Sequence, residues 1–201
     1  MKKAFLIILF CFVFIFCASA ARTKFYFDAG IGFGNGKTSW NYYNLSKGFP
    51  PQLTDLGIEA GGKIGIAPKR KMPLFLVMDL DWTGHRFIDD YGEYIQYSSV
   101  LFGPGLVYYP KDSLQLAATA GISVASYKES WTDAKKSYEG GVGWSTSAAL
   151  DIGGKKKGTL LGVKYLTTFN DIIYWDDFEA AYFVYHQKNS VFSVFVRFVS
   201  R

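Results

Sequence analysis

Apolar and small residues alternate with a period of two through most of this 201-residue sequence. In the segment 141–152 one face carries Val142, Trp144, Thr146, Ala148, Leu150 and Ile152, and the other carries only glycine, serine, alanine and one aspartate. Because successive side chains of a strand point to opposite sides of a sheet, this pattern predicts β-strands rather than amphipathic helices. Seven further segments follow the pattern: 25–33, 56–66, 74–82, 94–109, 114–127, 159–169 and 191–199.

The connections between these segments alternate in length. Short, turn-forming connections cover 67–73, 110–113 and 153–158, and longer ones cover about 35–55, 84–93, 128–140 and 170–190. An even number of strands of about ten residues, joined alternately by tight turns and long loops, is typical of a transmembrane barrel. The sequence therefore predicts an all-β fold, a closed antiparallel up-and-down barrel of eight strands.

The composition of the two strand faces indicates which of them points outward. The polar face of a soluble barrel should be rich in lysine and glutamate. Here that face is mostly glycine, serine, alanine and threonine, and only 19% of the whole chain is charged. Small side chains suit the crowded interior of an eight-stranded barrel, so we expect the apolar face to meet lipid. The alternative is a secreted, lipocalin-like soluble barrel with its apolar face inside.

The predicted inner face also carries a few charges of both signs. These residues are Asp28, Glu59, Lys63, Asp79, Asp81, Asp151, Lys164 and Arg197. Because buried charges must be paired, we expect a salt-bridge network in the lumen. Asp79 and Asp81 alternatively form a carboxylate pair for acid–base chemistry or cation binding, but the lysines and the arginine on the same face favour the structural interpretation. We expect no metal and no cofactor.

The first 20 residues have the pattern of a secretory signal peptide. Two lysines precede an apolar run over 4–17 and a small cleavage site at 18–20. Cleavage after Ala20 leaves a single barrel domain, 21–201, that contains neither of the two cysteines and has 20 basic against 17 acidic residues. Disulfides and zinc–thiolate sites are then excluded, and the balanced charge argues against nucleic-acid binding. An uncleaved anchor and a lipoprotein acylated at Cys17 are the alternatives.

Candidate catalytic residues are few. His85 and His186 are the only histidines, and both are expected in external loops or at their margins. His85 lies near Asp89 and Asp90, so a lipid-modifying enzyme at the outer rim is an alternative function. Loop histidines are more often solvated or capping groups, and we predict no enzymatic activity.

The expected external loops are rich in aromatic and acidic residues. Candidates for contact with a ligand are Trp40, Tyr42, Tyr43, Trp175, Asp176 and Asp177. Aromatic side chains beside charges predict contact with a host or other extracellular ligand, or with lipid headgroups. The alternative is that these loops only pack on each other.

Two irregularities interrupt the pattern. Pro104 lies in the middle of a predicted strand between Gly103 and Gly105, which predicts a β-bulge. Phe75 and Val77 fall on the inner face, where they are expected to plug the periplasmic end of the lumen.

Two segments carry a family resemblance. The glycine-rich stretch Phe102-Gly-Pro-Gly-Leu-Val-Tyr-Tyr109 ends in aromatics, and the last strand alternates Phe192, Val194, Val196 and Phe198 before Val199-Ser200-Arg201. Over 24–199 the chain resembles the small eight-stranded outer-membrane proteins typified by OmpX, OmpW and the OmpA barrel domain. The resemblance implies an outer-membrane location, contact with its lipid and insertion by the barrel-assembly machinery. The OmpW likeness implies a narrow pore or lateral conduit for small or hydrophobic solutes, and the OmpX likeness implies a surface-exposed structural or adhesive protein.

Overall fold

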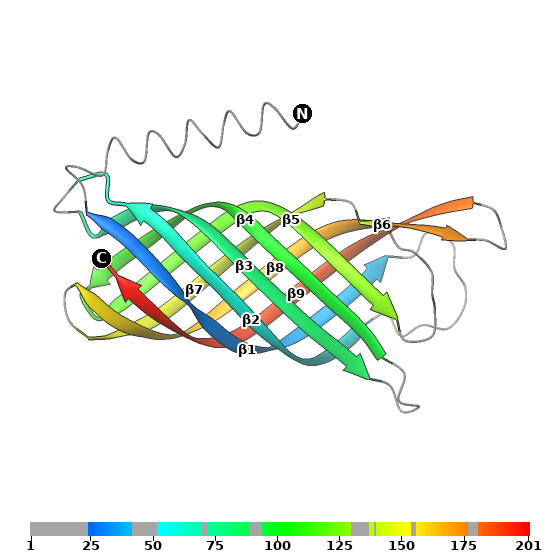
Figure 1. Cartoon of the computed structure of the whole chain (residues 1–201), viewed down its shortest axis with the longest axis horizontal. Coiled ribbons are helices and arrows are strands. Elements are labelled where there is room, and N and C mark those ends of the chain that lie inside the picture. Colours follow the sequence, from blue (N-terminus) through cyan, green and yellow to red (C-terminus); the bar gives the residue numbers. More distant parts are fainter. Residues whose placement is uncertain are drawn as a thin grey trace.

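The predicted eight-stranded up-and-down barrel is confirmed. The computed structural model describes residues 24–41, 52–69, 72–88, 94–129, 137–138, 140–153, 156–176 and 181–201. Their strands are β1 (Phe25–Asn41), β2 (Gln52–Ile66), β3 (Leu74–Ile88), β4 (Tyr94–Lys111), β5 (Leu114–Glu129), β6 (Ser137–Tyr138), β7 (Gly140–Gly153), β8 (Lys157–Asp176) and β9 (Ala181–Ser200). All neighbours pair antiparallel, β1 pairs with β9 to close the barrel, and the two-residue β6 adds to β8 beyond the start of β7 (Figure 1). In the part of the chain that the structure describes, no helix is long and apolar enough to cross a membrane.

The barrel strands are longer than the side-chain pattern predicts. They run for 14 to 20 residues, so parts of the expected loops are strand. Trp40 lies in β1, and Trp175 and Asp176 lie in β8, rather than in loops. The reason is that antiparallel pairing satisfies backbone groups whether or not the side chains still alternate in type. The other loop candidates, Tyr42, Tyr43 and Asp177, and the expected signal peptide over 1–20, lie outside the described residues.

The two ends of the barrel differ. At one end, called the turn end, the connections 67–73, 112–113 and 154–156 join consecutive strands, and Lys24 and Arg201 lie there as well. At the opposite end, called the loop end, β1, β3, β5 and β8 finish and β2, β4, β7 and β9 begin. The turn end is on the left in Figure 1.

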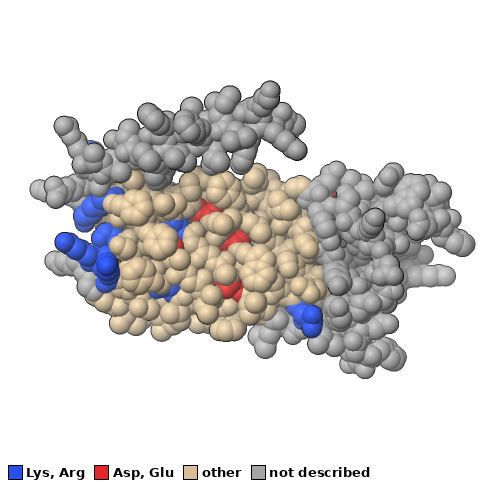
Figure 2. All heavy atoms as spheres, viewed as in Figure 1, with Lys and Arg blue, Asp and Glu red and all other residues tan. Residues whose placement is uncertain are grey.

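The apolar face points outward, as predicted. Phe33, Val142 and Ile31 are 65%, 61% and 60% exposed, whereas the alternate residues point into the lumen. Figure 2 shows a wall that is mostly uncharged, with lysine and arginine gathered at the turn end. A soluble barrel would place these apolar side chains inside, so the lipocalin-like alternative is wrong for this fold.

No bulge forms at Pro104. Pairing of β4 with β5 lapses at Gly103 and Pro104 and resumes in the same register at Gly105, opposite Thr119. The strands approach closely here, since a Cβ on Gly121 would lie 2.6 Å from the Gly103 Cα. Two residues without side chains therefore let the strand pass a proline without slipping. The register of this pair shifts instead between Tyr108 and Lys111, beside the turn.

The turn end of the lumen is filled with apolar side chains, as expected from Phe75 and Val77. Both are 3% exposed and belong to a buried cluster at this end. The Phe75 ring packs 5.1 Å from the Tyr26 ring and 6.2 Å from the Tyr109 ring, measured between centroids. We call this cluster the apolar plug; its members are Tyr26, Ala67, Phe75, Val77, Val107, Tyr109, Ala117, Ala149, Leu160, Phe195 and Val199.

Candidate functional site

All eight charged residues that were predicted on the inner face lie in the lumen, and each is at most 7% exposed. Arg197 of β9 is central among them. Its Nη1 atom is 3.1 Å from Asp28 Oδ1, and its Nη2 atom is 2.7 Å from Asp81 Oδ1 and 3.7 Å from Glu59 Oε1. One guanidinium thus contacts carboxylates from β1, β2 and β3, which its planar fork of donors suits better than a lysine would.

Lys164 adds a link across the full width of the barrel. Its Nζ atom lies 2.9 Å from Glu59 Oε2 and 3.0 Å from Asp81 Oδ1. Lys164 is on β8 and Asp81 is on β3, and these two strands stand opposite each other in the closed strand order. The lumen is therefore bridged from wall to wall by an ion pair with almost no exposure to solvent.

Two more pairs complete the lumen charges. Lys63 Nζ is 3.4 Å from Asp79 Oδ2, which also accepts a hydrogen bond of 2.7 Å from the Thr119 hydroxyl. Asp151 does not join the others, because it lies nearer the turn end and pairs with Arg201 at 3.2 Å. The central cluster is made of Asp28, Glu59, Lys63, Asp79, Asp81, Lys164 and Arg197, and is called the lumen network below. It holds four carboxylates and three cations.

A second wall-to-wall link lies between the lumen network and the apolar plug. Gln115 Nε2 donates to the Tyr26 hydroxyl at 2.7 Å and to the Tyr109 hydroxyl at 2.9 Å, and the Tyr26 hydroxyl donates to Asp28 Oδ2. Gln115 is on β5 and Tyr26 is on β1, again opposite strands. Sequence reasoning missed these neutral residues; the signal was their position on the same inward face as the predicted charges.

Toward the loop end the lumen is polar but less charged. His85 was expected in an external loop or at its margin, but it lies in β3, inside the barrel, and is 2% exposed. The close fit of its ring depends on a glycine, since a Cβ on Gly57 would lie 2.1 Å from His85 Nδ1. A residue that lines the lumen in this way is not free at the outer rim, where an enzyme acting on lipid would need it.

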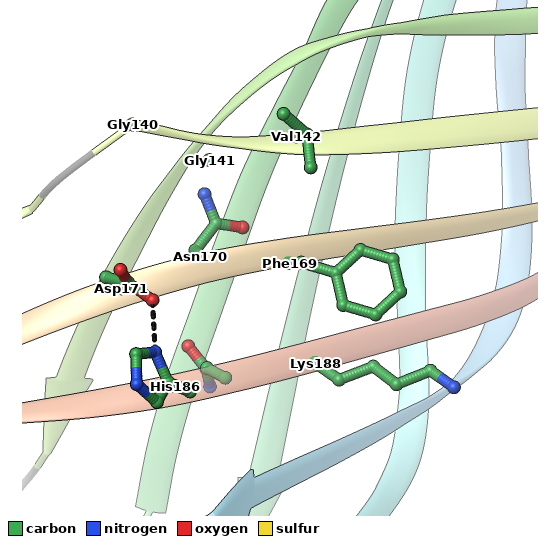
Figure 3. A pocket seen from close by; sticks show the side chains of 9 residues that line it. Gly140, Gly141, Val142, Phe169, Asn170, Asp171, His186 and Lys188 are labelled. Atoms are coloured by element: carbon green, nitrogen blue, oxygen red, sulfur yellow. Dashed lines mark hydrogen bonds and ion pairs between the residues drawn. The ribbon is translucent and has the colours of Figure 1, made fainter.

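A pocket of about 490 Å³ lies at the loop end, where β7 begins beside β8 and β9. It is lined by Gly140, Gly141, Val142, Phe169, Asn170, Asp171, His186, Gln187 and Lys188. Figure 3 shows Asp171 and His186 facing each other across β8 and β9, with Phe169 and Lys188 beside them. The Asp171 Oδ1 and His186 Nδ1 atoms are 2.6 Å apart, and both side chains are about half exposed.

Asp79 and Asp81 are the carboxylate pair that the sequence offers as an alternative for cation binding. Within the described ranges, no group of three or more histidine, cysteine, aspartate or glutamate residues is arranged to hold a metal ion. The Asp79 and Asp81 carboxylates instead contact lysine, arginine and threonine side chains.

Comparisons with known proteins identify the fold. No protein-family model and no curated protein matches the chain. The structure is similar to outer membrane protein AlkL in lipid bilayers, with 12% identity and a TM-score of 0.52 over 91% of this chain and 93% of that one. It is also similar to Neisserial surface protein A, with 15% identity and a TM-score of 0.50 over 86% and 95%. The outer membrane protease OmpT of Escherichia coli matches with 8% identity and a TM-score of 0.51 over 88% and 96%. The fold is thus that of the small outer-membrane β-barrels, which confirms the resemblance given by the sequence.

Proposed function

We propose that this protein is an integral outer-membrane barrel with a closed lumen, which acts as a surface-exposed structural or adhesive protein through its loop end. The wall supports the membrane location. Large apolar side chains are exposed along every barrel strand, and water would be a poor solvent for such a surface. A band of this kind, closed without free strand edges, is what a bilayer accommodates.

The observation that carries the closed lumen is the Lys164–Asp81 ion pair between opposite walls. Removing one partner of a buried ion pair costs about 3–5 kcal/mol, because the other charge stays buried and unpaired. The Gln115–Tyr26 link and the apolar plug close the lumen again toward the turn end. A solute on the axis would have to break each of these contacts in turn.

A conducting barrel and a rim enzyme are the competing functions. Conduction requires the Lys164–Asp81 pair to open. Among the described residues, the only other carboxylate in contact with Lys164 is that of Glu59, so the lysine would gain no new partner when the pair opens. OmpT is a protease, but the similarity between this chain and OmpT extends to the fold alone. Of the two histidines, only His186 lies at the loop-end pocket, where it contacts Asp171.

Single-cysteine labelling in intact cells tests the membrane location and the orientation. Lys37 is exposed near the loop end and Lys157 is exposed at the turn end. A membrane-impermeant maleimide should label a Lys37→Cys variant in intact cells and a Lys157→Cys variant only after permeabilisation. The proposal predicts that both variants stay with the membrane after alkaline carbonate washing. Release into the soluble fraction, or labelling of Lys157→Cys alone, would contradict it.

A further inference from the structure

We propose that the turn end of the barrel binds anionic phospholipid headgroups through a ring of exposed lysines. This inference rests on the membrane location proposed above, and not on the surface role of the loop end. Figure 2 shows lysine and arginine gathered at the turn end, beside a wall that is mostly uncharged. Five lysines are exposed there, and we call them the basic rim: Lys24, Lys69, Lys111, Lys156 and Lys157.

The basic rim has almost no acidic partners within the protein. Two acidic residues are described at the turn end. Asp151 is buried and pairs with Arg201, and only Asp112 is exposed. None of the five lysines forms an ion pair with a described residue. Their charges are therefore available to an anion that comes from outside the protein.

The two sets of connections have opposite charge. The three turn segments, 67–73, 110–113 and 153–158, contain seven basic residues and one acidic residue. The four longer connections of the sequence pattern contain seven basic and eleven acidic residues. An exposed excess of one sign attracts partners of the opposite sign, so this separation predicts an anionic partner for the turn end alone.

The basic rim surrounds the barrel instead of marking one side of it. Lys24 precedes β1, Lys69 lies between β2 and β3, and Lys111 ends β4. Lys156 and Lys157 lie where β8 begins. In the closed strand order these positions are distributed around the circumference. A folded partner or a single polymer strand would meet one sector of such a ring, whereas the headgroup layer of a bilayer meets all of it.

The wall next to the basic rim supplies the apolar part of a lipid site. Phe25 directly follows Lys24 and is 47% exposed, and Tyr108, in the same strand as Lys111, is 44% exposed. Exposed aromatic side chains are typical of the level at which a barrel wall meets the headgroups. A lysine stem can lie along such apolar surface while its ammonium group reaches a phosphate. A lipid whose headgroup contacts the lysines would therefore have its acyl chains against the wall, which a water-soluble polyanion lacks.

Lysine recognises the net charge of a headgroup more than its shape. Its ammonium group is a compact point charge on a flexible stem, unlike the planar fork of an arginine. Phosphatidylglycerol and phosphatidylcholine both contain a phosphodiester, but choline cancels its charge. We therefore expect the basic rim to prefer phosphatidylglycerol. Each lysine at an anionic lipid surface contributes about fivefold to binding.

Native mass spectrometry of the refolded chain, residues 21–201, tests the assignment by counting the lipids that stay bound on release from micelles. The micelles should contain phosphatidylglycerol and phosphatidylcholine in equal amounts and with the same acyl chains, so that only the headgroups differ. We expect phosphatidylglycerol to be retained in preference. A Lys156→Gln, Lys157→Gln double variant should reduce this preference by about fivefold or more.

A Lys37→Gln, Lys188→Gln double variant is the matched control, since it removes the same charge from two exposed lysines toward the loop end. It should keep the preference for phosphatidylglycerol. A Lys156→Arg, Lys157→Arg double variant retains the charge of the turn end and should keep the preference as well.

Three results would overturn the proposal. The native chain could show no preference for phosphatidylglycerol, or the turn-end and loop-end glutamine variants could lose it equally. Binding of soluble polyglutamate without a preference between the lipids would instead assign the basic rim to a water-soluble polyanion. If the lipid preference is absent while both cysteine variants stay with the membrane after carbonate washing, the headgroup site is wrong and the membrane barrel stands.

Discussion

The two halves of the lumen each contain one deeply buried glutamine, and the two amides differ in their hydrogen bonds. In the half toward the turn end, Gln115, Tyr26 and Asp28 form a connected chain of donors and acceptors above a plug of apolar side chains. In the half toward the loop end, Gln187 is equally buried, but its amide has no hydrogen-bond partner among the described residues, whereas Ser123 and Asn170 nearby bond to each other. The difference indicates that the amide of Gln115 helps to stabilise the fold and that of Gln187 does not.

The unpaired amide of Gln187 has a cost in stability that the paired amide of Gln115 does not have. Satisfied networks make a unique interior rigid, whereas an unpaired amide lowers stability unless something binds to it. The lumen network lies between the two halves and fixes the opposite walls at a set distance. The barrel can therefore tolerate one unpaired amide on the loop side of this network.

Removing the central cation should give the largest effect. Arg197→Met leaves Asp28 and Asp81 buried without their strongest partner, and we expect a loss of about 3–5 kcal/mol in the free energy of unfolding. Urea unfolding of the refolded barrel, followed by tryptophan fluorescence, measures it. Lys157→Met, at an exposed lysine of the turn end, is the control and should change stability by less than about 0.5 kcal/mol. Equal effects of the two variants would show that the lumen network does not hold the walls together.

Adding one methyl group should lower stability in the tightly packed interior and have little effect beside the pocket. A Cβ on Gly121 would lie 2.1 Å from the Phe102 carbonyl oxygen, whereas for a Cβ on Gly140 the nearest atom of the described residues is the Ser123 carbonyl oxygen at 3.8 Å. We expect Gly121→Ala to cost about 1–3 kcal/mol and Gly140→Ala to be close to neutral in the same unfolding assay. If Gly140→Ala were the more damaging, the pocket would not be open space.

Substitution of the two glutamines should have different effects on stability. Gln115→Leu removes hydrogen bonds to Tyr26 and Tyr109, and should lower stability by about 1 kcal/mol. Gln187→Leu removes no hydrogen bond to another described residue, so thermal unfolding should be unchanged or shifted upward. A lower unfolding temperature for Gln187→Leu than for Gln115→Leu would reverse the comparison between the two halves.

The C-terminal residue should contribute least. The Arg201 guanidinium carbon lies 3.9 Å from the centre of the Tyr109 ring, and its Nη2 atom is 3.2 Å from Asp151 Oδ2. Arg201 is near the surface, so we expect Arg201→Gln to cost about 0.5–1 kcal/mol, with most of the loss from the contact with the ring. A loss as large as that of Arg197→Met would mean that the stability of the turn end depends on the contacts of Arg201 rather than on the apolar plug.

Much of the barrel could be predicted from the sequence because strand side chains alternate strictly. Position on the inner face alone was enough to place Asp79, Lys164 and Arg197 in the lumen, where the structure has them. It could not pair them, because Lys164 meets Asp81 only after the barrel closes with a particular stagger between opposite strands. His85 was misplaced because the apolar alternation stops at Trp82, while the backbone pairing continues to Ile88.

The pocket could not have been found from the sequence. Gln115 and Gln187 both fall on inward positions of long strands, and no local feature tells the partnered one from the unpartnered one. The difference depends on which residues stand opposite each other in the closed barrel, which is a property of the tertiary structure.

Contacts between opposite walls close the lumen, and single-channel recording can measure whether any ion passes it. Refolded protein should be inserted into planar bilayers beside an Asp81→Asn, Lys164→Met double variant, in which the ion pair between the walls is absent. A closed lumen predicts no unitary current steps from the native chain or from this variant, because the Gln115–Tyr26 link and the apolar plug still close the turn end. Ion flux is expected only when Gln115→Ala and Phe75→Ala are added to the variant. Discrete, reproducible current steps from the native chain would contradict a closed lumen and make the barrel a conduit.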